Sequence, residues 1–198
     1  RDFPESTVGL LLSARGIGNW LSFLIVVSLT NFSPRLAIAI GFTCHVITGL
    51  GMAHLDMNLT VWDVFWTKAL QGFGMGIIYV PMTIIAFSSL SNRDLAEASA
   101  VFHMLRNMGS SIFISLSVTL VVTSTITNYA GFTEFATTIN ELFRYPGLVG
   151  SWNVDSQEGL IGLSGEMRRQ AAMIGYINAF YFYTFAACAA LPLALLVK

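Results

Sequence analysis

Five long apolar stretches, separated by polar breaks, dominate the sequence. They cover about 5–29, 36–55, 61–90, 95–127 and 168–197. A helix needs roughly 20 residues to cross the hydrocarbon core of a bilayer, and each stretch reaches about that length. The pattern therefore predicts an all-α membrane protein with five transmembrane helices.

The breaks between these stretches carry signals at which membrane helices end. Asn31 and Ser33 interrupt the first apolar run, and Pro34 suits the first turn of the next helix. Residues 128–167 contain no apolar run long enough to cross a bilayer. They predict a single extramembrane loop with a short helix over 132–143.

Basic residues in the short loops predict the orientation of the chain. Arg35 follows the first span and Arg93 follows the third, whereas the connection 56–60 holds no Lys or Arg. The positive-inside rule then places Arg35 and Arg93 in the cytoplasm. Long loops translocate largely regardless of charge, so the loop 128–167 is expected on the outer face.

Composition narrows the class of protein further. Of 198 residues, 55% are hydrophobic and only 11% are charged, which suits a chain whose surface faces lipid. A net charge of −1 offers no basic surface for nucleic acid. The sequence has no metalloprotease, serine hydrolase or phosphate-loop motif, so no enzyme activity, catalytic residue, metal or cofactor is predicted.

Two arginines lie deep inside predicted spans. Placing such a cation at the centre of a membrane helix costs at least about 2.5–3.5 kcal/mol, so it usually faces a bundle interior or a water-filled cavity. Arg15 and Asn19 share one helix face, as do His103 and Arg106. These stripes predict one aqueous cavity, with structural clamping of carbonyl groups as the alternative for the arginines. His103 could handle protons or be a bystander.

The third span combines small and polar residues. Gly72 and Gly76 are spaced like a small-xxx-small ridge, which lets a second helix approach closely. Gln71 and Tyr79 fall on a face with two methionines. Packing is the preferred interpretation for the methionines, and a binding role is considered for Gln71 and Tyr79.

Several segments together resemble a known transporter family. They are Ala-Leu-Gln-Gly-Phe-Gly-Met-Gly at 69–76, followed by Pro81, then Arg-Asn-Met-Gly-Ser-Ser-Ile at 106–112, and Ala-Arg-Gly-Ile-Gly at 14–18. In this order they resemble the second half of the EmrB/QacA-type drug:proton antiporters of the major facilitator superfamily. The resemblance covers essentially the whole chain.

The resemblance implies fourteen helices in the full protein, of which these five are similar to the last five. The chain, residues 1–198, would be most of a C-terminal six-helix bundle that lacks its N-terminal transmembrane half, and its first residue, Arg1, agrees with a piece of a longer protein. The first, third and fourth spans would face the central cavity. Two departures are Asn31, where the family has a charged loop residue, and Phe113, where it has glycine.

The candidate residues that follow fall into two groups. The substrate-cavity candidates are Arg15, Asn19, Gln71, Tyr79, His103, Arg106 and Asn107. The helix-packing candidates are Gly72, Gly76, Pro81 and Gly109.

The function implied is multidrug efflux in the bacterial inner membrane, as proton-coupled antiport of amphipathic small molecules by alternating access. The proton gradient would supply the energy, and a periplasmic adaptor protein could contact the long loop. A second hypothesis is a facilitator or exporter of a defined metabolite such as an organic acid, with Arg15 and Arg106 as carboxylate clamps. A third is a membrane scaffold or sensor that transports nothing.

Overall fold

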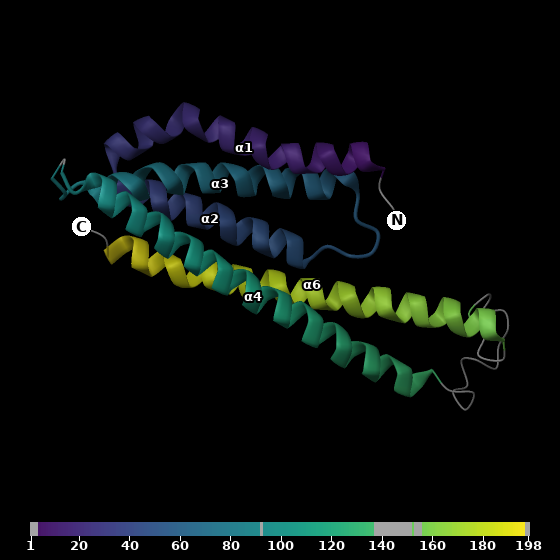
Figure 1. Ribbon diagram of the computed structural model, residues 1–198. Helices are drawn as coiled ribbons and strands as arrows, with labels where there is room; N and C mark the ends of the chain where they lie inside the picture. Colours follow the sequence, from purple (N-terminus) through teal and green to yellow (C-terminus); the bar gives the residue numbers. More distant parts are fainter. Residues whose placement is uncertain (1–3, 92, 137–151, 153–155, 197–198) are drawn as a thin grey trace. The chain divides into compact units, whose positions relative to one another are not determined.

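The computed structural model describes residues 4–91, 93–136, 152 and 156–196. Its regular elements within these ranges are helices (Figure 1): α1 (Glu5–Phe32), α2 (Pro34–Ala53), α3 (Val61–Phe87), α4 (Leu95–Phe135) and α6 (Gln157–Leu196). All five are long and apolar enough to cross a membrane. The predicted all-α membrane fold with five candidate spans is confirmed.

Side-chain caps define where α2 and α3 begin. Ser33 Oγ accepts a hydrogen bond from the backbone N–H of Leu36 at 3.4 Å, and Pro34 occupies the first turn, where no N–H is needed. At α3, Thr60 Oγ1 accepts from the Asp63 N–H at 3.3 Å, and the Asp63 carboxylate accepts from the Thr60 N–H at 2.9 Å. This capping box satisfies two donors that would otherwise lack partners at the helix start.

Glycines bring α1 and α3 into backbone contact. A Cβ atom on Gly72 would overlap the Arg15 carbonyl, and one on Gly18 would overlap the Ala69 carbonyl. A Cβ on Gly76 would likewise collide with a side chain of α1. No residue larger than glycine fits these positions without a shift of the helices, so the crossing depends on them.

The opposite side of α3 packs against α2. A Cβ on Gly74 would lie 2.9 Å from Cβ of Cys44, and one on Gly41 would lie 2.8 Å from the Gly74 carbonyl oxygen. Successive helix residues are about 100° apart, so Gly74 points away from Gly72 and Gly76 by roughly 160°. Gly72 and Gly76 therefore face α1, whereas Gly74 faces α2. α3 lies between these two helices (Figure 1).

The described chain divides into two compact units. One contains the described residues up to Ile114 together with those from Phe180 onward, and the other is Ser115–Ala179. All candidate residues predicted from the sequence belong to the first unit.

Within the second unit, small and polar side chains join α4 to α6. Asn178 Nδ2 donates a hydrogen bond to Ser124 Oγ at 2.7 Å. Asn128 Nδ2 donates to the Ser124 carbonyl oxygen at 2.8 Å. A Cβ on Gly175 would lie 2.7 Å from Thr125 Oγ1, so this glycine also permits close approach.

The helices extend beyond several predicted boundaries. The fourth span was expected to end near 127 and the fifth to begin near 168, but α4 continues to Phe135 and α6 begins at Gln157. The loop predicted over 128–167 is therefore helical at both ends. Of the short helix predicted over 132–143, residues 137–143 lie outside the described residues.

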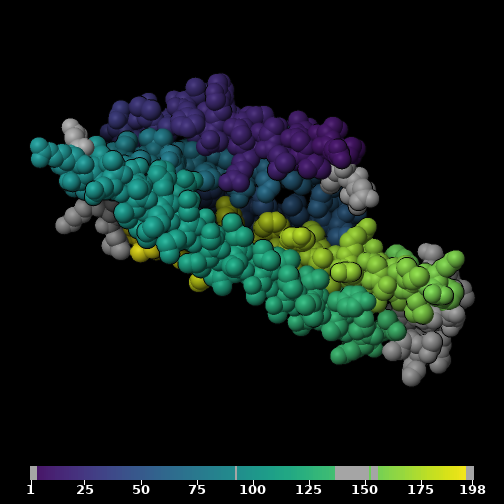
Figure 2. All heavy atoms as spheres, viewed as in Figure 1, coloured from purple at the N-terminus to yellow at the C-terminus, as the bar shows by residue number. Residues whose placement is uncertain are grey.

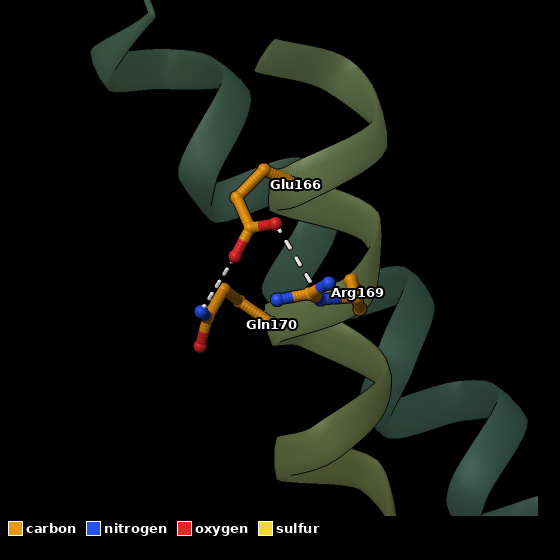
Figure 3. Close-up of polar contacts among 3 residues, drawn as sticks. All are labelled: Glu166, Arg169 and Gln170. Atoms are coloured by element: carbon orange, nitrogen blue, oxygen red, sulfur yellow. Dashed lines mark hydrogen bonds and ion pairs between the residues drawn. The ribbon is translucent and has the colours of Figure 1, made fainter. Parts of the chain in front are cut away.

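The physical reason is that hydropathy locates the membrane and not the end of a helix. Local polar pairs join successive turns of α6 around the position where the fifth span was expected to begin (Figure 3). The Arg169 guanidinium lies 3.4 Å from the Glu166 carboxylate, and Gln170 donates to the same carboxylate at 2.9 Å. Differences at the first three spans are at most three residues, with α1 ending at Phe32 and α3 at Phe87.

Candidate functional site: a cavity with two arginines

A cavity of about 470 Å³ lies between α1, α3 and α4 in the first unit. Side chains of α1, in purple, and of the first part of α4, in teal, border a hollow in the space-filling view (Figure 2). We call it the arginine cavity. Its lining residues come from all three helices: Leu12, Arg15, Gly16, Asn19, Phe23, Gly72, Met75, Gly76, Tyr79 and Arg106.

Arg15 is positioned by the glycine contact between α1 and α3. The Arg15 carbonyl group lies in the space that a side chain at Gly72 would occupy. This close approach lets the Arg15 guanidinium reach α3 about one turn beyond Gly72. There Nη2 donates to Met75 Sδ at 3.2 Å. A thioether is a weak acceptor and a guanidinium has five N–H donors, so most of the donor capacity of Arg15 remains available for a ligand or water.

Arg106 is placed by an aromatic ring. Its guanidinium carbon lies 5.2 Å from the centre of the Tyr79 ring, a cation–π contact within the distance at which such pairs attract. Tyr79 is 39% exposed, so the pair is accessible. Each arginine of the cavity thus contacts a side chain of α3, and neither contact neutralises its charge.

The cavity is electropositive. Its lining includes two guanidinium groups and no carboxylate among the described residues. Arginine stays protonated in proteins and can bind a planar anion through two parallel hydrogen bonds. Asn19, half-buried on the same side of α1, adds an amide that can donate or accept. The arrangement suits a ligand that combines a polar or anionic group with an apolar body.

The structure brings four of the seven predicted cavity residues together. Arg15, Asn19, Tyr79 and Arg106 line the arginine cavity. The other three are elsewhere.

Gln71 faces α6, where its Nε2 donates to the Tyr183 hydroxyl at 3.2 Å. His103 is exposed, with its ring 5.6 Å from that of Phe102. Asn107 is exposed too, one residue beyond Arg106 and therefore rotated by about 100° around α4. None of the three is among the residues that line the arginine cavity.

The helix-packing candidates also differ among themselves. Gly72, Gly76 and Pro81 are buried, and both glycines contact α1. Gly109 is exposed, and a Cβ there would meet nothing within 4 Å among the described residues. The packing expected of Gly109 is therefore not made here, because its face of α4 has no neighbour in the described part of the chain.

Sequence reasoning missed several lining residues that a helical period could have found. Leu12, Gly16 and Phe23 recur with Arg15 and Asn19 along one face of α1. Met75 is one of the two methionines for which the sequence favours packing, but its Sδ accepts the hydrogen bond from Arg15, and it lies one turn before Tyr79.

Comparison with known proteins identifies three curated relatives. The colistin resistance protein EmrB of Acinetobacter baumannii is 25% identical over 124 residues, or 59% of this chain and 23% of that protein. The multidrug export protein EmrB of Haemophilus influenzae is 30% identical over 84 residues, or 42% and 16%. The uncharacterized MFS-type transporter YhcA of Bacillus subtilis is 23% identical over 115 residues, or 58% and 22%.

These matches are partial. The matched segments span about a fifth of the length of the relatives, with shares of 23%, 16% and 22%. No family model matches the chain. No solved structure matches it either. None of the three names describes an enzyme. The chain is a multi-pass membrane protein with distant, partial similarity to EmrB multidrug exporters and to a transporter of the major facilitator superfamily.

Proposed function

We propose that this chain supplies one wall of the substrate cavity in an exporter of amphipathic small molecules. The observation that carries the proposal is the arginine cavity, where Arg15 and Arg106 lie beside apolar and aromatic side chains of α1 and α3. The likeness to EmrB multidrug exporters supports the same function. The remaining wall would come from a transmembrane half outside this chain, as in carriers built from two bundles.

In this proposal the residues have separate roles. Arg15 and Arg106 bind the polar or anionic group of a substrate, and each releases its present contact on α3 to do so. Met75 and Phe23 contact the apolar body, and methionine adapts to different shapes because its side chain is flexible. The whole bundle rocks against the missing half to expose the cavity to either side of the membrane.

Energy would come from proton entry. The arginine cavity has no acid among its described lining residues, so groups that bind and release the proton belong, in this proposal, to the rest of the full-length protein. The setting is the bacterial inner membrane. In this proposal the segment between α4 and α6 is on the outer side of the membrane, where a periplasmic adaptor could bind.

A labelling experiment tests that topology. Gly165 is exposed on α6 and has open space around it, so Gly165→Cys should be tolerated. In whole cells, an impermeant maleimide should label it. Labelling that appears only after lysis would invert the orientation.

A second candidate function is export or facilitated movement of a defined organic acid. Two guanidinium groups without a carboxylate among the described lining residues favour it. The two candidates differ in selectivity: a multidrug exporter accepts many apolar bodies, whereas a metabolite carrier requires one carboxylate geometry.

Efflux from cells separates the candidates. The full-length protein would be expressed in cells loaded with matched anionic, neutral and cationic amphiphiles, at set pH gradients. Multidrug export predicts gradient-dependent efflux of several unrelated compounds, reduced in Arg15→Gln and Arg106→Gln but not in Arg93→Gln, an exposed arginine before α4. Efflux of a single acid would favour the second candidate. Absence of efflux for every compound would contradict both and favour a scaffold or sensor.

A further inference from the structure

A second cavity of about 380 Å³ lies on the other side of the two contacts that hold the arginines. It is bounded by α2, α3 and α4, and its lining is mostly apolar: Phe42, His45, Met75, Ile78, Tyr79, Met82, Phe102, Leu105 and Arg106. We call it the side compartment. All of its lining residues belong to the first unit.

The two cavities share a wall. Met75, Tyr79 and Arg106 line both of them. Two of these are the α3 side chains that the arginines contact, since Arg15 donates to Met75 and Arg106 lies over Tyr79. A ligand group that drew the guanidiniums away would therefore release the two side chains that separate the cavities.

The linings of the two cavities differ in charge and polarity. The arginine cavity presents two cations and an amide, whereas the side compartment adds Phe42, Phe102 and Leu105 and no further charged group among its described lining residues. Its remaining polar member is His45, whose Nδ1 is buried without a hydrogen-bond partner in the described part of the chain. Apart from His45 and the shared wall, the lining consists of hydrocarbon, aromatic and thioether groups, which solvate a charge poorly and favour apolar groups.

We propose that the side compartment binds the apolar tail of a substrate whose anionic head lies between Arg15 and Arg106. The inference rests on the proposed function and names its substrate class: anions with a flexible alkyl or aryl tail. The head displaces the contacts to Met75 and Tyr79, and the tail passes between these side chains. Flexible methionine and a rotatable tyrosine suit a wall that has to open.

Alkyl sulfonates of increasing length test the proposal, because their charge is fixed and only the tail varies. The affinity of each for the purified full-length protein in nanodiscs would be measured by competition. If tails enter the compartment, affinity should rise about fourfold per buried methylene. Leu105→Trp fills the compartment from an exposed position and should abolish the rise for long tails while leaving short sulfonates unaffected.

Met104→Trp is the matched control. Met104 is 54% exposed and lines neither cavity, whereas Leu105 is 59% exposed and lines the compartment. The control should keep the full dependence on tail length. An equal dependence in Leu105→Trp and Met104→Trp would overturn the proposal.

A photoreactive probe locates the tail directly. A dodecyl sulfonate with a terminal diazirine should form adducts on Phe42, Phe102 or Leu105, and a propyl analogue should label Leu12 or Phe23 instead. A dodecyl trimethylammonium probe with the same diazirine should not form adducts on Phe42, Phe102 or Leu105. Equal labelling by the cation would mean that bilayer chains enter generally, and would overturn the inference.

Photolabelling does not require transport. It therefore tests the side compartment independently of the proposed export function. Compartment adducts with no efflux of the parent sulfonate would contradict the exporter but keep the site. Efflux with adducts confined to the arginine cavity would contradict only the side compartment.

Discussion

α3 and α4 are both long apolar helices that contribute to the arginine cavity, yet their surroundings differ completely. α3 buries Gly72, Gly74 and Gly76 between two neighbours. α4 has no buried residue among those described, and large side chains such as Leu105, Met108 and Ile112 are more than half exposed. Similar hydropathy therefore accompanies two different kinds of packing.

The difference teaches what determines a helix position when lipid is the solvent. Without a hydrophobic driving force between helices, close packing depends on small residues at the contact. α3 has them at intervals that face α1 and α2. α4 presents bulky side chains instead, so its exposed face suits lipid or a transmembrane half outside this chain. The predictions below test this contrast, beginning with the largest expected effect.

Gly72→Ala should destabilise the bundle strongly. Its new methyl group would overlap the backbone of Arg15, which cannot move without shifting α1. Overpacking of this kind typically costs about 1–3 kcal/mol, and here backbone is involved, so the upper end is expected. Thermal unfolding in detergent and the amount of full-length protein in the membrane would both fall.

Gly109→Ala is the matched change on α4. A Cβ there has open space, and alanine is favoured over glycine in a helix by up to about 1 kcal/mol, so stability should be unchanged or slightly higher. A large loss of stability would reveal that the rest of the full-length protein packs against Gly109. Equal tolerance of both substitutions would contradict the backbone contact between α1 and α3.

Arg106→Ala should abolish most transport while leaving stability intact. Among the described residues, the Arg106 guanidinium contacts the Tyr79 ring, and Arg106 is exposed, so the bundle should not depend on it. Hydrogen bonds to charged groups contribute about 1.5–3 kcal/mol, which corresponds to about a ten- to hundredfold loss of substrate affinity. Arg106→Lys keeps the charge but loses the planar fork, and should be nearly as impaired.

The measurement is efflux by the full-length protein, with its membrane level and melting temperature followed in parallel. A fall in melting temperature along with activity would instead support a structural clamp. Normal efflux by Arg106→Ala at a normal membrane level would contradict both interpretations.

Much of the fold was predictable from sequence because lipid imposes simple rules. Apolar runs of sufficient length predicted the five spans, and Pro34 marked the start of α2 correctly. Spacing of Gly72 and Gly76 indicated a close helix contact, although it could not identify α1 as the partner. The C-terminal end of α4 and the start of α6 were not predictable from hydropathy, since polar residues continue both helices beyond the apolar runs.

The candidate site was predictable only in part. Arg15 and Arg106 could be identified from the sequence because a cation inside a membrane span is energetically costly and usually faces a cavity or the bundle interior. Gln71 shares its predicted face with Met75 and Tyr79, but it lies at the edge of that face and finds Tyr183 on α6 instead. The helical period shows which residues of α3 share a face. It does not show which other helix packs against that face.

Tyr79→Leu should strengthen binding of anionic substrates, whereas Tyr79→Phe should change it little. Phenylalanine keeps the ring beneath the Arg106 guanidinium, whereas leucine removes it. A cation–π contact contributes about 0.5–2 kcal/mol, and the substrate has to displace it, so leucine should raise affinity about two- to thirtyfold. Binding of a fixed anion to the purified protein provides the measurement. Weaker binding in Tyr79→Leu would show that Arg106 keeps its contact with the ring when the anion is bound.

Gln71→Leu should have the smallest effect, and on stability alone. It removes the hydrogen bond to the Tyr183 hydroxyl, a contribution of about 0.5–1.5 kcal/mol, without touching the arginine cavity. Tyr183→Phe removes the same bond from the other side. The double variant should therefore lose less stability than the sum of the two single changes, by about the energy of that bond. Substrate profiles of all three variants should match that of the unsubstituted protein. A changed profile in Gln71→Leu, with Tyr183→Phe unaffected, would place Gln71 in the binding site and would mean that α3 turns toward the cavity more than its present contacts with α6 indicate.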